Sequence, residues 1–279
     1  WSSRLMPSLF ILMIGLILYV LTQDGAMAGL KHYLVPDFSQ ITNPKLIVSA
    51  MGQAFFSMSL GVGTMLVYGS YIRADENLPV VGALVTLTDT SVAFLAGLLV
   101  LPAIFVAQEL GVTIYAESGN LIAGPDLIFK VLPALFEGMG VTGLFIGFVF
   151  FVLMSIAAVT SSISMLEVPV SYAVEAHQVD RNKATRLVGL VVLTISTLIC
   201  LNFDSLFGFV ITMTTERAQP LLSMMLCVFA GWVFYRNSIL QELKSGSPDV
   251  EQGMFWKIWP VYVRFFCPVL ILLTFAQGF

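Results

Sequence analysis

Hydroxyl side chains and glycines interrupt one apolar stretch of the sequence near its middle. Residues 52–71 read GQAFFSMSLGVGTMLVYGSY, with Ser57, Ser59, Gly61 and Gly63 between flanks that are apolar enough to cross a membrane. Glycine weakens a helix by about 1 kcal/mol, and serine offers the backbone competing hydrogen bonds. Unwound backbone is tolerated in a membrane only beside a cavity or other protein, and secondary transporters build ion and substrate sites from such broken helices. The alternative is a small-residue surface on which another helix packs.

A carboxyl group lies near the middle of a second apolar stretch. The segment TLTDTS places Asp89 among threonines, inside a predicted span over 79–110. An ionised aspartate at the centre of a bilayer costs at least ~2.5–3.5 kcal/mol, so it needs a partner. A bound cation would supply one, and a hard ion such as sodium suits carboxylate, hydroxyl and carbonyl oxygens. The alternative is a protonated Asp89 that is hydrogen-bonded to the neighbouring threonines.

A third segment, SIAAVTSSISMLEVP, gathers oxygen atoms on one helix face. Ala157, Thr160 and Ser161 are spaced i, i+3, i+4, and Met165 follows one turn beyond. Two hydroxyls and a backbone carbonyl on one face could chelate a cation. Alternatively, the hydroxyls bond back to the preceding turn of their own helix.

The segment TMTTERAQPLL carries charged residues in another apolar stretch. Glu216 and Arg217 are adjacent and therefore point in different directions, and Pro220 breaks or kinks the helix. Such groups are functional candidates inside a membrane. The alternative is that they lie near the external water boundary.

The composition indicates a polytopic helical membrane protein that must position these groups. The chain is 58% hydrophobic and 11% charged, whereas soluble domains are about a quarter charged. The net charge of −4 gives no indication of the positively charged surface that nucleic-acid binding requires. Seven spans are predicted, over residues 5–22, 46–71, 79–110, 139–174, 186–203, 205–235 and 255–278.

The segments that connect the predicted spans contain fewer residues that indicate structure or function. The polar segment between the first two spans is predicted to be a loop, and residues 117–138 are predicted to form short helices. His32 and His177 are interpreted as solvated loop residues. The three cysteines are interpreted as packing thiols: Cys200, Cys227 and Cys267.

The distribution of basic residues predicts the orientation. With the N-terminus in the cytoplasm and the C-terminus outside, the positive-inside rule is satisfied. The residues then in or beside cytoplasmic loops are Arg4, Arg73, Arg181, Lys183, Arg186, Arg236, Lys244 and Lys257, and the external ones are Lys31, Lys45 and Lys130. The sequence opens WSSRLMPSLF, without an initiator methionine or a signal-peptide n-region. We therefore expect the C-terminal part of a longer transporter-like chain.

Taken together, these motifs resemble the neurotransmitter:sodium symporter family, in its bacterial amino-acid transporter branch. The resemblance runs from GQAFFSMSLGVGTMLVYGSY through TLTDTSVAFLAGLLVLPAIF and GPDLIFKVLPALF to AAVTSSISMLE and covers nearly the whole chain. It implies an all-α fold of two inverted five-helix repeats, of which helices five to eleven are present. Residues 1–279 would be one transmembrane domain fragment: 1–22 ends the first repeat, 46–235 form the second, and 255–278 are an additional helix. The preceding helices would be missing.

The resemblance also implies two sodium sites and a substrate site. Ser57 and Asp89 would bind the first sodium ion, and the Ala157 carbonyl, Thr160 and Ser161 the second. Residues 57–61 would be the unwound hinge of the central site. The substrate site would be lined by Phe56 as an aromatic lid, Ser57, Ser59, Val62, Ser161 and Met165. Because Val62 replaces a bulkier residue, we expect a large apolar or aromatic amino acid as substrate.

Gating residues follow from the same resemblance. Tyr71 and Glu175 match the cytoplasmic gate, whose arginine partner would lie in the missing helices. The acidic residue of the outer gate is replaced by Ile211, so either Glu216 substitutes for it one to two turns deeper or this gate is absent. Asp89 supplies a fixed negative charge where chloride-dependent relatives bind chloride. Independence of chloride is therefore predicted, together with proton counter-transport if Asp89 protonates after sodium leaves.

The predicted function, for the full-length protein in the inner (plasma) membrane, is sodium-coupled amino-acid symport by alternating access. The partners would be the amino acid, the lipid bilayer and the missing helices, with sodium but no organic cofactor. No nucleophile–base pair, phosphate loop or metal-ligand cluster in the sequence supports an enzyme. Two alternatives are an ion channel or passive pore, for which LGVGT would be a carbonyl filter, and a non-transporting amino-acid receptor of the same fold.

Overall fold

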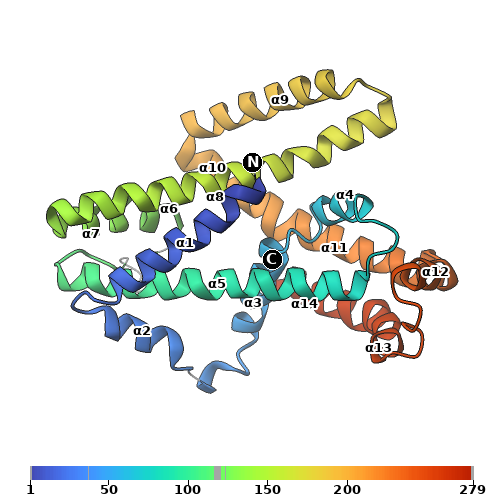
Figure 1. Ribbon diagram of the computed structural model, residues 1–279, viewed down its shortest axis with the longest axis horizontal. Coiled ribbons are helices and arrows are strands. Elements are labelled where there is room, and N and C mark those ends of the chain that lie inside the picture. Colours follow the sequence, from blue (N-terminus) through green and yellow to red (C-terminus); the bar gives the residue numbers. More distant parts are fainter. Residues whose placement is uncertain (1, 37, 116–120, 123, 278–279) are drawn as a thin grey trace. The chain divides into compact units, whose positions relative to one another are not determined.

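The protein is all-α, as predicted. A computed structural model describes residues 2–36, 38–115, 121–122 and 124–277, and outside its helices the described backbone forms one isolated bridge, between Tyr115 and Leu121. The first helices are α1 (Ser2–Val20), α2 (Ala26–Leu34), η1 (Phe38–Gln40), α3 (Pro44–Ser57), α4 (Thr64–Ser70), α5 (Leu78–Glu109), α6 (Gly124–Asp126), η2 (Leu127–Val131) and α7 (Leu132–Gly138). The others are α8 (Gly140–His177), α9 (Arg181–Leu201), α10 (Phe203–Ile211), η3 (Thr212–Ala218), α11 (Gln219–Val228), η4 (Phe229–Val233), α12 (Arg236–Gly246), α13 (Met254–Val261), η5 (Tyr262–Phe266) and α14 (Cys267–Gln277) (Figure 1).

Several helices are long and apolar enough to cross a membrane. Within the described ranges four continuous helices meet this criterion: α5, α8, α9 and the segment Met254–Leu273. A fifth span would be the pair Ser205–Val233 and Arg236–Gly246, which bends by 99°. The predicted span 5–22 is a shorter apolar helix, and the predicted span 46–71 is divided between α3 and α4. Leucines on α9 are more than half exposed, as expected of a helix that faces lipid. The chain is a polytopic helical membrane protein.

Two connections are more helical than the sequence predicted. The segment expected to be a loop contains α2, and His32 lies within it. This short helix packs on α5, because the Tyr33 hydroxyl donates to the Phe94 carbonyl at 3.3 Å and the Tyr33 and Phe94 rings lie 5.6 Å apart. Tertiary packing therefore stabilises a helix whose own sequence signal is weak. His177 is the last residue of α8 and not a loop residue. The short helices expected over 117–138 are observed from residue 124 onward.

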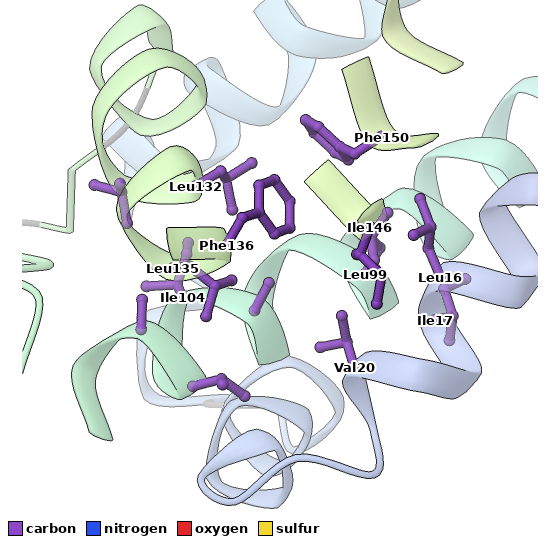
Figure 2. Packing of buried hydrophobic residues seen from close by; sticks show 14 of the residues in the cluster. Leu16, Ile17, Val20, Leu99, Ile104, Leu132, Leu135, Phe136, Ile146 and Phe150 are labelled. Carbon is purple, nitrogen blue, oxygen red and sulfur yellow. The ribbon is translucent and has the colours of Figure 1, made fainter. Parts of the chain in front are cut away.

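The helices divide into two compact units, formed by residues 1–38 with 90–162 and by residues 39–89 with 163–279. The first unit has a continuous hydrophobic core (Figure 2). It is built from side chains of α1, the second half of α5, α7 and the first half of α8. Members labelled in the figure include Leu16, Val20, Leu99, Ile104, Leu135, Phe136, Ile146 and Phe150.

The second unit contains the interrupted segment and the C-terminal helices. Within it, α11 packs against both α14 and α3. A small separate core forms where α12 meets α13, from Leu243, Val250 and Trp256. The second unit therefore holds most of the chemistry-bearing residues that the sequence indicates.

Candidate functional site

The break predicted in the second span is present. Helix α3 ends at Ser57 and α4 begins at Thr64 (Figure 1). Between them Gly61 and Gly63 have φ angles of 78° and 85°, and Ser59 has a φ of 51°. A positive φ is easily adopted by glycine but is uncommon for other residues. The two glycines therefore allow the chain to leave the helical path here, and Ser59 is held in a strained conformation between them and α3.

The break packs tightly against α11. A Cβ atom added to Gly61 would lie 2.2 Å from the Gln219 carbonyl oxygen and 2.5 Å from Ser223 Oγ. Gln219 is only 3% exposed, and its Nε2 donates to the Phe55 carbonyl at 2.8 Å. The same carbonyl also accepts from the Leu60 N–H at 3.0 Å, so the Gln219 bond is its second and ties α11 to the end of α3. The glycines thus serve both expected purposes, since they interrupt the helix and also permit close helix contact.

Ser57 and Asp89 lie in direct contact. The Ser57 hydroxyl is 2.8 Å from Asp89 Oδ1 and 2.9 Å from Oδ2, so its single proton is shared between the two carboxylate oxygens. Ser57 is the last residue of α3, and Asp89 lies in α5, half-buried. An open cleft lined by Val81, Leu84, Val85, Thr88 and Asp89 adjoins the carboxylate. Three oxygen atoms therefore meet at the end of a broken helix, an arrangement that can ligate a hard cation.

Two further hydroxyl groups lie at the break itself. Thr64 Oγ1 and Ser223 Oγ are buried and have no hydrogen-bond partner within the described part of the chain. Neither Gln219 nor Ser223 was singled out from the sequence. Gln219 lies in the segment TMTTERAQPLL and Ser223 directly follows it. Their position beside the break depends on how α11 packs against α3.

The residues predicted for a second sodium site lie in the first unit. The Thr160 hydroxyl is 3.0 Å from the carbonyls of both Ile156 and Ala157, which is the back-bonding geometry of the alternative interpretation. Thr160 is 7% exposed, Ala157 is half-buried, and Ser161 is exposed. The Ala157 carbonyl and the Thr160 hydroxyl are therefore neighbours, whereas a sodium ion at this position stays a prediction.

Of the predicted substrate residues in the second unit, Phe56, Ser59 and Val62 lie at or beside the break, and Met165 lies in α8. Phe56, Val62 and Met165 are exposed, with 53%, 39% and 47% of their surface accessible, and Ser59 is half-buried. Their contact with a substrate stays a prediction, as does that of Ser161 in the first unit.

Tyr71 lies in a polar network that the sequence did not indicate. Its hydroxyl is 2.7 Å from Glu167 Oε1 and 3.0 Å from Ser171 Oγ. Arg181 Nη2 donates to both oxygens of Glu167, at 2.8 and 2.9 Å. Glu175, predicted to share a gate with Tyr71, is exposed, and its carbonyl accepts a bond from Gln178. The network therefore places Tyr71 on Glu167, two turns before Glu175 on α8.

The predicted outer-gate positions lie on α10 and η3. Ile211, the last residue of α10, is 40% exposed. The side chain of Glu216 lies outside the described part of the structure, so its proposed substitution for the gate stays a prediction. Arg217 Nη1 lies 3.9 Å from Met213 Sδ. Residues 212–218 form a π-helix, a local widening that is frequent at functional sites.

A serine–aspartate pair at the break of an interrupted helix is the kind of arrangement from which secondary transporters build their midplane ion sites. The fold and the site thus define a helical membrane protein of the broken-helix class. The chain belongs to the sodium:neurotransmitter symporter family, which matches it over residues 1–279. This is a family of transporters and not of enzymes.

Known relatives agree with this assignment. An uncharacterized sodium-dependent transporter of Haemophilus influenzae is 34% identical over 280 residues, which cover 98% of this chain and 59% of the relative. The uncharacterized sodium-dependent transporter YhdH of Bacillus subtilis is 33% identical over 287 residues, covering 99% and 60%. The crystal structure of MhsT in complex with L-phenylalanine superposes with a TM-score of 0.82 at 33% identity, over 99% of this chain and 62% of that one. The chain therefore has the predicted symporter fold and spans about six-tenths of the length of these relatives.

Proposed function

We propose that the full-length protein is a sodium-coupled amino-acid symporter that works by alternating access. The observation that carries this proposal is the Ser57–Asp89 contact at the break between α3 and α4. Membership of a sodium symporter family and two sodium-dependent relatives support the choice of ion.

In this proposal Ser57 and Asp89 hold the first sodium ion. Without the ion, the serine proton is shared between the carboxylate oxygens at 2.8 and 2.9 Å. A cation would take the place of that proton as the partner of Asp89, and the hydroxyl would turn its lone pairs toward the ion. Because the pair joins the end of α3 to α5, sodium would fix the position of the break and so bias the protein toward one conformation. The second ion would be held by the Ala157 carbonyl, Thr160 and Ser161.

The substrate we propose is a hydrophobic or aromatic amino acid. The similar MhsT structure contains L-phenylalanine. In this chain Phe56, Ser59, Val62 and Met165 would contact the substrate, with Val62 leaving room for a large side chain. The unwound backbone near Ser59 offers N–H and C=O groups to its charged ends.

Asp89 would make transport independent of chloride, because the carboxylate already supplies a negative charge beside the sodium ion. Its protonation after sodium leaves would return a proton in the opposite direction. We further propose that the protein lies in the inner (plasma) membrane with residue 1 on the cytoplasmic side and residue 279 outside, as the distribution of basic residues predicts.

Uptake by the full-length protein in proteoliposomes tests this function. A labelled mixture of amino acids is supplied with a sodium gradient or with sodium replaced by a large organic cation. Saturable accumulation that requires sodium is expected, and Ser57→Ala and Asp89→Ala should abolish it. Flux that neither saturates nor needs sodium would identify a pore instead. Substrate binding without flux would identify a receptor.

A further inference from the structure

Arg264 lies inside the last predicted span, 255–278, yet the structure places it beside the end of the preceding one. Trp232 Nε1 donates to the Arg264 carbonyl at 3.2 Å. Gly231 makes this approach possible, since a Cβ atom there would lie 3.0 Å from Arg264 Cα. Helix η4 ends at Val233, Phe234 is extended, and the polar helix α12 then turns away by 99°. Arg264 therefore lies beside the point at which the apolar helix η4 ends and the polar helix α12 follows.

The guanidinium of Arg264 lies over an aromatic ring. Its Cζ lies 4.0 Å from the centroid of the Trp232 ring and 5.7 Å from that of Phe265. Stacking on one face holds the plane of the guanidinium while leaving its N–H groups, which lie in that plane, directed outward. The side chain is exposed, and no carboxylate forms an ion pair with it in the described residues.

A second arginine, at the start of α12, also lies over a tryptophan ring. Arg236, the first residue of α12, has its Cζ 5.2 Å from the centroid of the buried Trp256 ring. It too is exposed and has no carboxylate partner in the part of the chain that the structure describes. By contrast, Arg73, Arg181 and Lys244 are each paired with an acidic residue. Both arginines, each over a tryptophan ring, thus keep their N–H donors available.

We propose that the bend between η4 and α12 lies at the membrane surface, and that Arg264 and Arg236 bind the phosphate groups of anionic phospholipids there. A guanidinium presents two parallel N–H donors that match two phosphate oxygens. Tryptophan rings favour the headgroup level, so the exposed Trp232 would hold Arg264 at the depth of the phosphates. Basic pockets between membrane helices bind anionic headgroups in this way. The site is independent of the proposed transport activity and requires only that the chain lies in a membrane.

Native mass spectrometry of the full-length protein tests this site. Occupancy by phosphatidylglycerol is compared with occupancy by phosphatidylcholine for the wild type and for Arg264→Gln, Arg236→Gln and the double variant. One basic residue near an anionic surface contributes about 1 kcal/mol, which corresponds to about fivefold in binding. Each single variant should therefore reduce the preference for phosphatidylglycerol about fivefold, and the double variant about 25-fold. Inorganic phosphate at millimolar concentration should not displace the lipid.

The matched control is Arg73→Gln, which removes an exposed arginine that is already paired with Asp75 at 2.7 Å. It should leave the preference unchanged. An equal loss in Arg73→Gln would show a general charge effect and overturn the proposal, as would an unchanged preference in the double variant. Displacement of the lipid by inorganic phosphate would also overturn it, in favour of a soluble anion. If Arg264→Gln does not fold, Arg236→Gln in the polar helix α12 decides the question alone.

Discussion

Replacing Gly61 by alanine should destabilise the protein more than the same change at Gly63. Both residues have positive φ, at 78° and 85°, so each substitution costs about 1–2 kcal/mol of backbone strain. At Gly61 the new Cβ would also lie 2.2 Å from the Gln219 carbonyl, which must retreat by about 0.8 Å to reach 3.0 Å. Such overpacking costs about 1–3 kcal/mol. At Gly63 the nearest atom is a methyl carbon of Val168 at 3.1 Å, which can move more easily.

We therefore expect Gly61→Ala to lower the free energy of unfolding by about 2–5 kcal/mol and Gly63→Ala by about 1–2 kcal/mol. Both values are measured by denaturant unfolding of the purified full-length protein in detergent. Gly52→Ala is the control, because Gly52 lies inside α3 with open space around it, and this change should not destabilise. If Gly61→Ala lowers the free energy of unfolding no more than Gly63→Ala does, the close contact between Gly61 and α11 does not add to the cost of the substitution. That result would refute the reasoning.

Three further predictions concern the contacts of the second unit. Asp89→Asn should make uptake depend on added chloride, since the fixed negative charge is lost; unchanged uptake in chloride-free buffer contradicts this. Gln219→Leu should lower the free energy of unfolding by about 0.5–1.5 kcal/mol, because the Phe55 carbonyl loses the Gln219 donor at 2.8 Å and keeps only the Leu60 N–H. Denaturant titration measures that loss, and wild-type stability would exclude the bond as a support of the break. Glu167→Gln should cost about 1–2 kcal/mol, less than a fully buried pair, because Arg181 is largely exposed. Thermal unfolding checks this value, and an unshifted transition would refute it.

The sequence by itself determined the class of protein and the place of the break. Membrane helices follow from composition and from the length of apolar stretches, which are local properties of the chain. The interruption near Gly61 and Gly63 is also local, since glycine adopts the positive φ angles observed there without steric cost. The order of the motifs was specific enough to indicate the symporter family, which the comparison over the whole chain confirms.

Only the tertiary structure decided which polar groups meet. The Ser57–Asp89 contact joins residues 32 positions apart; the residues alone offered a cation or neighbouring threonines as partners of Asp89, and only the family resemblance placed Ser57 beside it. The bond from Gln219 to the Phe55 carbonyl spans 164 positions, and the bond from Tyr71 to Glu167 spans 96. No periodic pattern encodes such pairs, because they depend on how the helices pack against one another. Arg264 shows the same limit: its position in the sequence indicated only the interior of a span, whereas the packing of η5 on η4 places it beside Trp232.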